Sequence, residues 1–275
     1  MANVLIIGAG WLGTPLAEVL LGQGHKVTAT RRSQSRLDEY RTSGIYPALL
    51  NLADSDCKKQ LSSLIKKHNI ERIIGTFPPG FRKGNGDEYA KQWHKVIDVA
   101  KKEQIQKVVM VSSTTVYPNV AADMKEEDAT LSLAKDNPNF SSNAQIILQA
   151  EQYIIHSNVE FAILRCSGLI GADRHPSRFT NRLKQVSSQA PANMLHQQDA
   201  AYVTAFALSQ IKNQIVNVTT PNTVSKAEFY QAAIEKSGLN LSLPPITHTP
   251  DKRIVADKLI ALGYQFMFKS TLDAI

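Results

Sequence analysis

The chain contains few cysteines and no long apolar run. Among its 275 residues, Cys57 and Cys166 are the two cysteines, and they lie far apart without a C-x-x-C pattern. Isolated cysteines of this kind are typical of reduced thiols in a cytoplasmic protein. No apolar run approaches the ~20 residues of a membrane span, and the first residues show no signal-peptide pattern. We therefore expect a cytoplasmic protein with no membrane partner.

Metal-ligand spacings and long runs of one charge are also missing. The histidines and cysteines form no cluster with metal-ligand spacing, so no metal site is expected. The formal net charge is +7. The lysines and arginines are nevertheless scattered in pairs, and no RNA-binding motif of interleaved basic and aromatic residues is found. We expect no nucleic-acid partner. A modestly basic surface that attracts a polyanionic small-molecule substrate explains the charge as well.

A glycine-rich turn near the N-terminus is the most informative motif. It follows a short apolar segment, has the pattern G-x-G-x-x-G and precedes an apolar-periodic helix. Gly8 permits the tight turn, Gly10 lets the backbone approach a pyrophosphate, and Gly13 lets the helix pack on the strand. The helix N-terminus offers free N–H groups and a positive dipole end to phosphates. We therefore predict a dinucleotide site that includes the intervening residues Trp11 and Leu12.

The end of the second predicted strand indicates which dinucleotide binds. An NAD site usually has an Asp or Glu about 20 residues beyond the glycines, where it accepts from the ribose 2′-hydroxyl. Here Arg31 and Arg32 occupy that region and no acid does. Guanidinium groups match the 2′-phosphate of NADP in charge and geometry, so NADP is favoured over NAD. The alternative is that both arginines are solvated surface residues.

Predicted strands and helices alternate along the chain, which indicates an α/β fold. The strands are expected at residues 4–7, 26–30, 46–50, 72–77, 107–112, 161–164 and 215–219, and the helices at 33–43, 57–68, 88–102, 142–156, 199–210, 225–237 and 257–262. This order predicts a Rossmann doubly wound parallel sheet with ligands at the carboxyl ends of its strands. Residues 1–170 are expected to form the NAD(P)-binding domain. Residues 171–275 are expected to form a small substrate-side cap interleaved with it.

Five later segments, in order, carry a resemblance to a known family. They are S-S-T-T-V-Y at 112–117, K-E-E-D-A-T-L at 125–131, L-R-C-S-G-L-I-G at 164–171, L-H-Q-Q-D at 195–199 and L-G-Y at 262–264. With the glycine turn, they resemble extended short-chain dehydrogenases/reductases of the NAD-dependent epimerase/dehydratase family, which includes nucleoside-diphosphate-sugar epimerases. The likeness covers nearly the whole chain. It implies a nicotinamide cofactor, hydride chemistry and a sugar-like substrate, with a nucleotide sugar as one candidate.

One departure from that family concerns the catalytic pair Y-x-x-x-K. The family places the lysine four residues before a glutamate, and Glu151 sets this register here. Asn143 then occupies the tyrosine position and Ile147 the lysine position. Asparagine does not transfer protons near neutral pH, and isoleucine does not hydrogen-bond a ribose. The chain therefore resembles an atypical member with an altered active site.

The segment after the fifth predicted strand supplies the remaining catalytic candidates. Ser113 stands where the family has the hydroxyl that bonds the reacting oxygen, and its neighbour Thr114 is a possible substitute. The alternative is a polar strand end whose hydroxyls are all satisfied. Tyr117 is the nearest remaining phenol and a candidate for the lost acid/base. Packing is the alternative role for Tyr117.

Further binding residues follow from the resemblance. Asn51 stands where relatives have an aspartate that contacts adenine, and the Leu52 backbone could share that role. The loop after the fourth strand is expected to pass beside the cofactor with Phe77 and Pro78. Arg82, in this loop, could meet a substrate phosphate, and the alternative is a solvated surface charge. Arg174 and Arg178 would suit the diphosphate of a nucleotide sugar.

Two functions remain open from the sequence. The first is an NADP-dependent oxidoreductase or epimerase that acts on a phosphate-bearing, sugar-like substrate. The second is a non-catalytic NADP-binding module that reports redox state to a partner. The missing catalytic pair favours the second, whereas Ser113 and the basic loops favour the first. The oligomeric state is also open, between monomer and homodimer.

Overall fold

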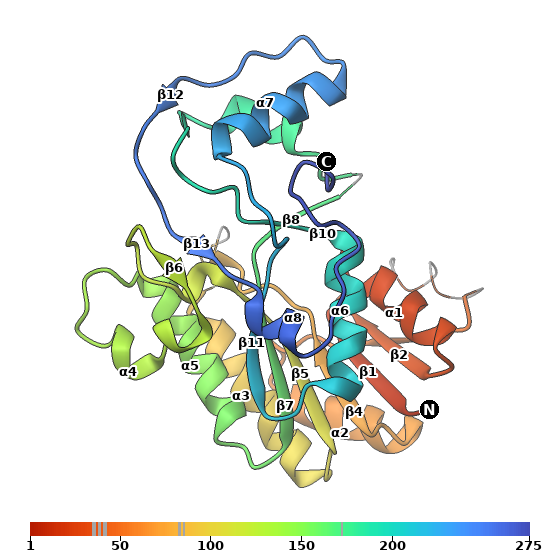
Figure 1. Cartoon of the computed structure of the whole chain (residues 1–275). Coiled ribbons are helices and arrows are strands. Elements are labelled where there is room, and N and C mark those ends of the chain that lie inside the picture. Colours follow the sequence, from red (N-terminus) through yellow and green to blue (C-terminus); the bar gives the residue numbers. More distant parts are fainter. Residues whose placement is uncertain (35–36, 38–39, 41–42, 82–83, 85, 172) are drawn as a thin grey trace.

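A parallel sheet forms the centre of the computed structural model, which describes residues 1–34, 37, 40, 43–81, 84, 86–171 and 173–275 (Figure 1). Its seven strands lie in the order β11-β7-β5-β4-β1-β2-β3, and every neighbouring pair is parallel. The strands are β1 (Asn3–Ile7), β2 (Lys26–Arg31), β3 (Tyr46–Leu49), β4 (Arg72–Gly75), β5 (Lys107–Ser113), β7 (Glu160–Cys166) and β11 (Gln214–Val218). This is a Rossmann doubly wound sheet, as predicted.

Helices cover both faces of the sheet because alternate residues of its strands are apolar on both sides. In β1, Val4 and Ile6 pack into one core and Leu5 and Ile7 into the other. The first core is closed by α1 (Gly13–Gly22) and α6 (Gln197–Gln210). The second is closed by α2 (Cys57–His68), α3 (Asp87–Lys102) and α5 (Ser142–Ile155).

The helices and strands lie close to their predicted positions. The polar helix expected at 33–43 falls largely outside the described residues. The last predicted strand, β11, is the edge strand of the central sheet, next to β7. The expected cap segment is therefore divided, because α6 and β11 belong to the layers of the Rossmann fold. The boundary at residue 170 stays a prediction.

The rest of the C-terminal segment forms an upper lobe (Figure 1). Its helix α7 (Lys226–Ser237) packs on the 3-10 helix η6 (Pro176–Arg182). Phe229 of α7 shares a small apolar cluster with Ile170, Ala192 and Ala274. The lobe's short strands are β8 (Gly168–Ile170), β9 (Val186–Ser187), β10 (Met194–His196) and β12 (Ile246–Thr247).

The remaining elements connect the two parts of the molecule. They are η4 (Thr114–Val116), β6 (Asp123–Met124), η5 (Glu126–Asp128), α4 (Leu131–Ala134), β13 (Arg253–Ile254) and α8 (Asp257–Ala261). β13 pairs in parallel with β6, and the paired residues Arg253 and Asp123 also form an ion pair. The chain after β12 thereby returns from the lobe to the sheet.

Asp199 lies in the first turn of α6 and is buried. The cap of α6 is His196, whose Nδ1 accepts from the Gln198 N–H at 3.2 Å. The buried Asp199 carboxylate instead accepts from the Tyr264 hydroxyl at 3.0 Å and the Met267 N–H at 2.9 Å. It thus fixes the C-terminal segment against α6.

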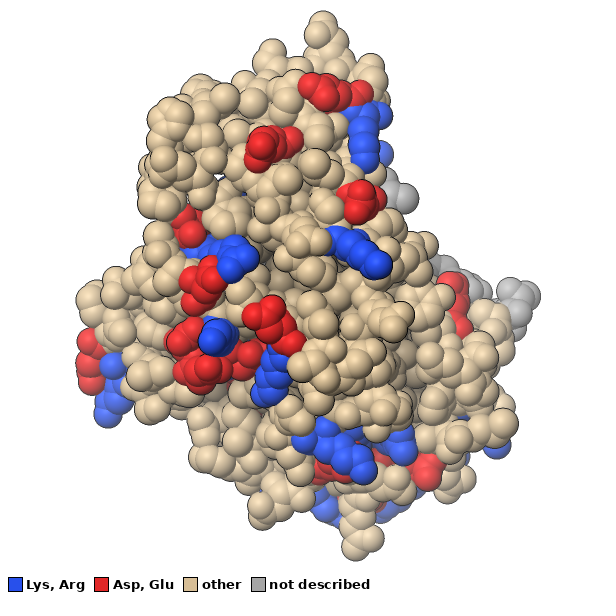
Figure 2. All heavy atoms as spheres, in the orientation of Figure 1, with Lys and Arg blue, Asp and Glu red and all other residues tan. Residues whose placement is uncertain are grey.

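Charges of both signs lie on the face of the molecule that Figure 2 draws. On the face drawn in Figure 2, lysines and arginines alternate with aspartates and glutamates instead of gathering in one basic patch. Among the described residues, no helix has the length and apolar character needed to cross a membrane.

Candidate functional site

The glycine turn lies at the point where the strand order of the sheet reverses. From β1 the chain passes to β2 and β3 on one side and then crosses to β4 on the other. β1 and β4 end level, with Ile7 paired to Gly75. Ligands of doubly wound sheets bind in the crevice outside the strand ends at this place.

Neighbouring strand ends hold the turn in shape. Gly8 has a φ of 90°, and its N–H donates to the Thr30 hydroxyl at 3.2 Å. The Ala9 N–H donates to the Thr30 carbonyl at 3.0 Å. From the end of β4, the Thr76 hydroxyl donates to the Gly8 carbonyl at 2.8 Å. The backbone of the turn is therefore fixed from both sides.

The three glycines of the turn have different surroundings. A Cβ added to Gly8 would lie 2.9 Å from the Phe77 backbone, and one added to Gly13 would lie 2.9 Å from the Thr76 hydroxyl. A Cβ on Gly10 would have the Gly8 carbonyl at 3.7 Å as its one neighbour within 4 Å among the described residues. Packing thus requires Gly8 and Gly13 to be glycines, whereas Gly10 leaves open space in front of the turn.

The open side of the turn is suited to an anion. Neither the Trp11 N–H nor the Leu12 N–H donates a hydrogen bond within the described part of the chain. The first turn of α1 contains no acidic residue, so the positive end of its dipole is not neutralised locally. These groups fit a pyrophosphate at the position predicted from the sequence.

Arg31 lies beside this turn, as its spacing from the glycines predicts. Its Nε donates to the Tyr40 hydroxyl at 3.1 Å and its Nη2 to the Thr14 hydroxyl at 3.2 Å. Thr14 is in the first turn of α1, and the buried Tyr40 donates to the Ala9 carbonyl at 2.8 Å. Arg32 is exposed. No sequence pattern indicates that Tyr40 connects the arginine to the turn.

The residues expected near adenine are partly engaged in local contacts. The Asn51 amide donates to Asp54 at 2.6 Å, and its oxygen accepts from the Ala53 N–H at 3.3 Å. Leu52 is buried, and its carbonyl accepts from the Lys95 ammonium at 3.0 Å. Adenine contacts by Asn51 and Leu52 stay a prediction.

The loop after β4 lies against the glycine turn. Phe77 meets Gly8, and its ring stacks on the buried Trp93 with centroids 4.8 Å apart. Pro78 follows and is exposed. Arg82, a candidate for substrate phosphate, lies outside the described residues. The start of the loop is therefore anchored in the core beside the turn.

Ser113 ends β5 and caps the 3-10 helix that follows. Its Oγ accepts from the Thr115 N–H at 3.1 Å and lies 2.9 Å from the Thr115 hydroxyl. Both Ser113 and Thr114 remain partly exposed. The Ser113 hydroxyl therefore has a structural partner, and a role toward substrate stays a prediction for both residues.

Tyr117 does not line an open site. Its side chain is 1% exposed, and its hydroxyl donates to Asn217 at 2.5 Å and accepts from Arg165 at 3.2 Å. Burial raises the pKa of Tyr117 to about 12, although the Arg165 guanidinium acts in the opposite direction. This geometry argues against the proposed acid/base role and gives the tyrosine a structural one.

Arg165 organises the polar core around Tyr117. It is fully buried, and its guanidinium forms an ion pair with Glu151 at 2.7 Å. It also donates to the carbonyls of Glu126 and Ala129, both at 2.8 Å. The second Glu151 oxygen accepts from Ser112 at 2.6 Å and from the Arg165 Nε at 3.1 Å. Glu151 and Arg165 therefore stabilise the fold behind the strand ends.

The positions that correspond to the family's catalytic pair are not equipped for proton transfer. Ile147 is 1% exposed and belongs to the core that α3 and α5 share. Asn143 lies one turn earlier in α5 and is half-buried. None of the eight tyrosines of the chain has a lysine four residues later. The lysine position of the family's catalytic pair is therefore part of the apolar core in this protein.

Two of the predicted substrate arginines, Arg174 and Arg178, follow β8 in the chain. The Arg174 guanidinium lies 4.0 Å from the centre of the Trp11 indole. The Arg178 Nη1 donates to the Asp173 carbonyl at 2.9 Å. Both arginines are exposed. The structure therefore brings Arg174 to the predicted cofactor turn.

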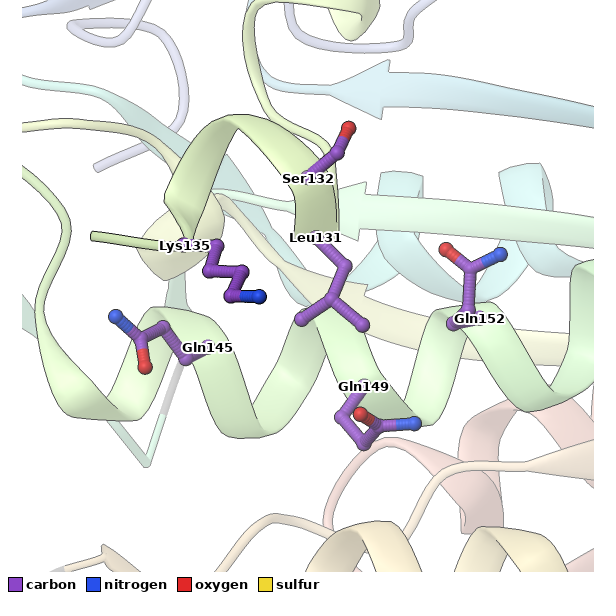
Figure 3. Close-up of a pocket in the computed structure, with 6 residues that line it drawn as sticks. All are labelled: Leu131, Ser132, Lys135, Gln145, Gln149 and Gln152. Carbon is purple, nitrogen blue, oxygen red and sulfur yellow. The ribbon is translucent and has the colours of Figure 1, made fainter. Parts of the chain in front are cut away.

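A separate depression of about 570 Å³ lies between α4 and α5. Figure 3 shows that α4 and the residue after it contribute Leu131, Ser132 and Lys135, and that α5 contributes three glutamines, Gln145, Gln149 and Gln152. The glycine turn is on the other side of the molecule, beside α1 (Figure 1). This depression is therefore not part of the dinucleotide site.

Comparison with known proteins agrees with this geometry. A family profile described as NAD(P)H-binding matches residues 8–213, well over half of the chain. The chain belongs to this NAD(P)H-binding family. It is 29% identical to Protein YeeZ of Escherichia coli K12 over 247 residues, and this matched region covers 87% of this chain and 85% of YeeZ.

Solved structures share the fold at lower identity. The Bordetella bronchiseptica enzyme WbmH, in complex with NAD+, has a TM-score of 0.77 and 19% identity, over 100% of this chain and 96% of that chain. The UDP-glucose 4-epimerase of Thermus thermophilus, in complex with NAD, has a TM-score of 0.75 and 16% identity, over 99% of this chain and 97% of that chain. The resemblance to the epimerase/dehydratase group is confirmed for the fold.

Proposed function

We propose that the protein is an NADP(H)-dependent oxidoreductase or epimerase of the cytoplasm. The observation that carries this proposal is the glycine turn, with open space at Gly10 and unused N–H groups at Trp11 and Leu12. The Arg31 guanidinium beside Thr14 supports a 2′-phosphate contact and therefore NADP rather than NAD.

The proposed substrate is a small phosphate-bearing, sugar-like molecule. The exposed Arg178 and the net charge of +7 would favour a substrate with phosphate groups. Structural relatives include UDP-glucose 4-epimerases, so a nucleotide sugar is one candidate. Ser113, at the end of β5, is our candidate for orienting the reacting hydroxyl or carbonyl.

The buried α5 positions favour a second candidate function, a non-catalytic NADP-binding module. Ile147 belongs to the core, and the Tyr117 hydroxyl is engaged by two side chains. Without a general acid or base in the site, bound NADP(H) would report redox state to a partner instead of reacting. The glycine turn and the arginines at the end of β2 support the binding module as much as they support the enzyme.

A fluorescence titration with NADPH and NADH tests the cofactor. We expect NADPH to bind about 10- to 100-fold more tightly, because each charge-assisted contact contributes roughly 1.5–3 kcal/mol before screening. Arg31→Ala with Arg32→Ala should remove that preference. Lys101→Ala with Lys102→Ala removes two exposed charges at the end of α3 and serves as the control. Equal affinities for both cofactors in the unaltered protein would overturn the choice of NADP.

Turnover separates the enzyme from the module. Nucleotide sugars and related phosphorylated sugars are incubated with NADP+ or NADPH, and hydride transfer is followed by nicotinamide absorbance and product analysis. Conversion that Ser113→Ala reduces supports the enzyme. Tight NADPH binding without conversion of any of these substrates supports the module.

A further inference from the structure

Trp11, in the middle of the glycine turn, is held by side chains from distant parts of the chain. Its indole N–H donates to the Asp173 carboxylate at 2.5 Å. Its carbonyl accepts from the Gln197 amide at 2.6 Å. A Cβ on the buried Gly171 would lie 3.1 Å from the indole ring. The upper lobe and the start of α6 thus both contact the turn through this one residue.

The positively charged side chain of Arg174 also contacts Trp11. Its guanidinium lies over the Trp11 ring, 4.0 Å from the centroid, which is a cation–π arrangement. Within the described part of the chain it forms no ion pair, although the neighbouring Asp173 carboxylate bonds the indole. The backbone N–H of Trp11 is one of the two unused donors of the turn. The Arg174 guanidinium therefore contacts the side chain of Trp11, the residue whose backbone N–H forms part of the open anion site.

We infer that Arg174 binds the pyrophosphate of the dinucleotide, with the Trp11 indole as its platform. This inference rests on the proposed cofactor function. It reassigns Arg174 from the substrate phosphate to the cofactor. A pyrophosphate at the Trp11 and Leu12 N–H groups carries charges that neutral donors and a helix dipole compensate only in part. The Arg174 guanidinium supplies a full charge from the upper lobe, which is already held on the turn through Asp173 and Arg174.

Two mononucleotides separate this contact from the one proposed for Arg31. ADP contains the pyrophosphate and lacks the 2′-phosphate, whereas 2′-AMP contains the 2′-phosphate and lacks the pyrophosphate. Binding is measured by calorimetry. Tryptophan fluorescence, to which Trp11 and Trp93 both contribute, is the second readout.

We expect Arg174→Ala to weaken binding of ADP, NAD+ and NADP+ by a common factor of about 5- to 30-fold, less than a full charge-assisted contact contributes because solvent screens this exposed site. Binding of 2′-AMP should not change. Arg31→Ala with Arg32→Ala should instead weaken binding of 2′-AMP and NADP+ and leave binding of ADP and NAD+ unchanged. Arg174→Lys, which keeps the charge, should recover part of the loss. Arg182→Ala, an exposed arginine at the end of η6, is the matched control.

The outcomes separate the two levels of the proposal. If the unaltered protein binds NADP+ and Arg174→Ala binds ADP equally well, the inference is wrong and the cofactor function stands. An equal loss for ADP and 2′-AMP would also overturn the inference, since it would indicate a general disturbance of the turn. If the unaltered protein binds neither dinucleotide, the proposed function fails as well.

Discussion

The strand end after β1 and the strand end after β5 use their polar groups in opposite ways. At the glycine turn, the Trp11 and Leu12 N–H groups and the space at Gly10 face outward. Behind β5, Tyr117 and Arg165 are buried and bonded to other protein groups. Both lie at the carboxyl ends of strands in one sheet, yet the donors at Trp11 and Leu12 face outward, whereas Tyr117 and Arg165 bond to other protein groups. The fold thus combines an open glycine turn with a buried Ile147 at the lysine position of the family's catalytic pair.

The physical reason for this difference is the amount of buried charge. Arg165 uses its N–H donors on Glu151, Tyr117 and backbone carbonyls, so its charge is compensated without solvent. A buried pair of this kind is costly to break, because the remaining charge would have no partner. The glycine turn has no such constraint, and its outer side is free to accept a dinucleotide.

The largest effect on the first region is expected from Gly10→Val. The new side chain would occupy the space through which a pyrophosphate approaches, while its Cβ would lie 3.7 Å from the Gly8 carbonyl, an ordinary contact. We expect dinucleotide affinity to fall at least about 100-fold, or about 2.7 kcal/mol, and the fold to be retained by circular dichroism.

Gly22→Ala is the control, because the Cβ added at this end of α1 would have no neighbour within 4 Å among the described residues. Unchanged NADPH affinity in Gly10→Val would place the cofactor elsewhere.

The second region should respond in stability instead of affinity. Glu151→Gln leaves the buried Arg165 charge without its carboxylate, so the free energy of unfolding should fall by about 3–5 kcal/mol. Urea denaturation measures this change. Below the unfolding transition, the variant should bind NADPH as the unaltered protein does.

The matched control is Glu88→Gln, which removes an exposed pair with Lys91 and should change little. A loss of NADPH affinity in folded Glu151→Gln, with no loss of stability, would refute the structural role.

The smallest effect is expected from Tyr117→Phe. It removes one buried hydroxyl and leaves the Asn217 oxygen and one Arg165 N–H with a partner fewer, so unfolding should become easier by about 1–3 kcal/mol. Any turnover found with a substrate should be preserved. A large loss of kcat at unchanged stability would instead restore Tyr117 to the mechanism.

Local spacing made the sheet and the glycine turn predictable. The turn is defined by residues 8–13, and Arg31 lies at the end of the next strand, so both follow from neighbours in the sequence. The contacts of Tyr117 and Trp11 could not be predicted in the same way. Tyr117 bonds Asn217, 100 residues away, and Trp11 bonds Asp173, 162 residues away. Such pairings depend on how the upper lobe packs on the sheet. Local sequence patterns do not indicate this packing.

A crystal structure of the protein with NADP+ tests the contrast between the two strand ends most directly. We expect the pyrophosphate within hydrogen-bonding distance of the Trp11 and Leu12 N–H groups, and the 2′-phosphate beside Arg31. Ile147 should remain in the core, without a contact to the nicotinamide ribose. A dinucleotide bound away from the glycine turn, or a ribose held by Tyr117 after rearrangement of α5, would contradict this arrangement.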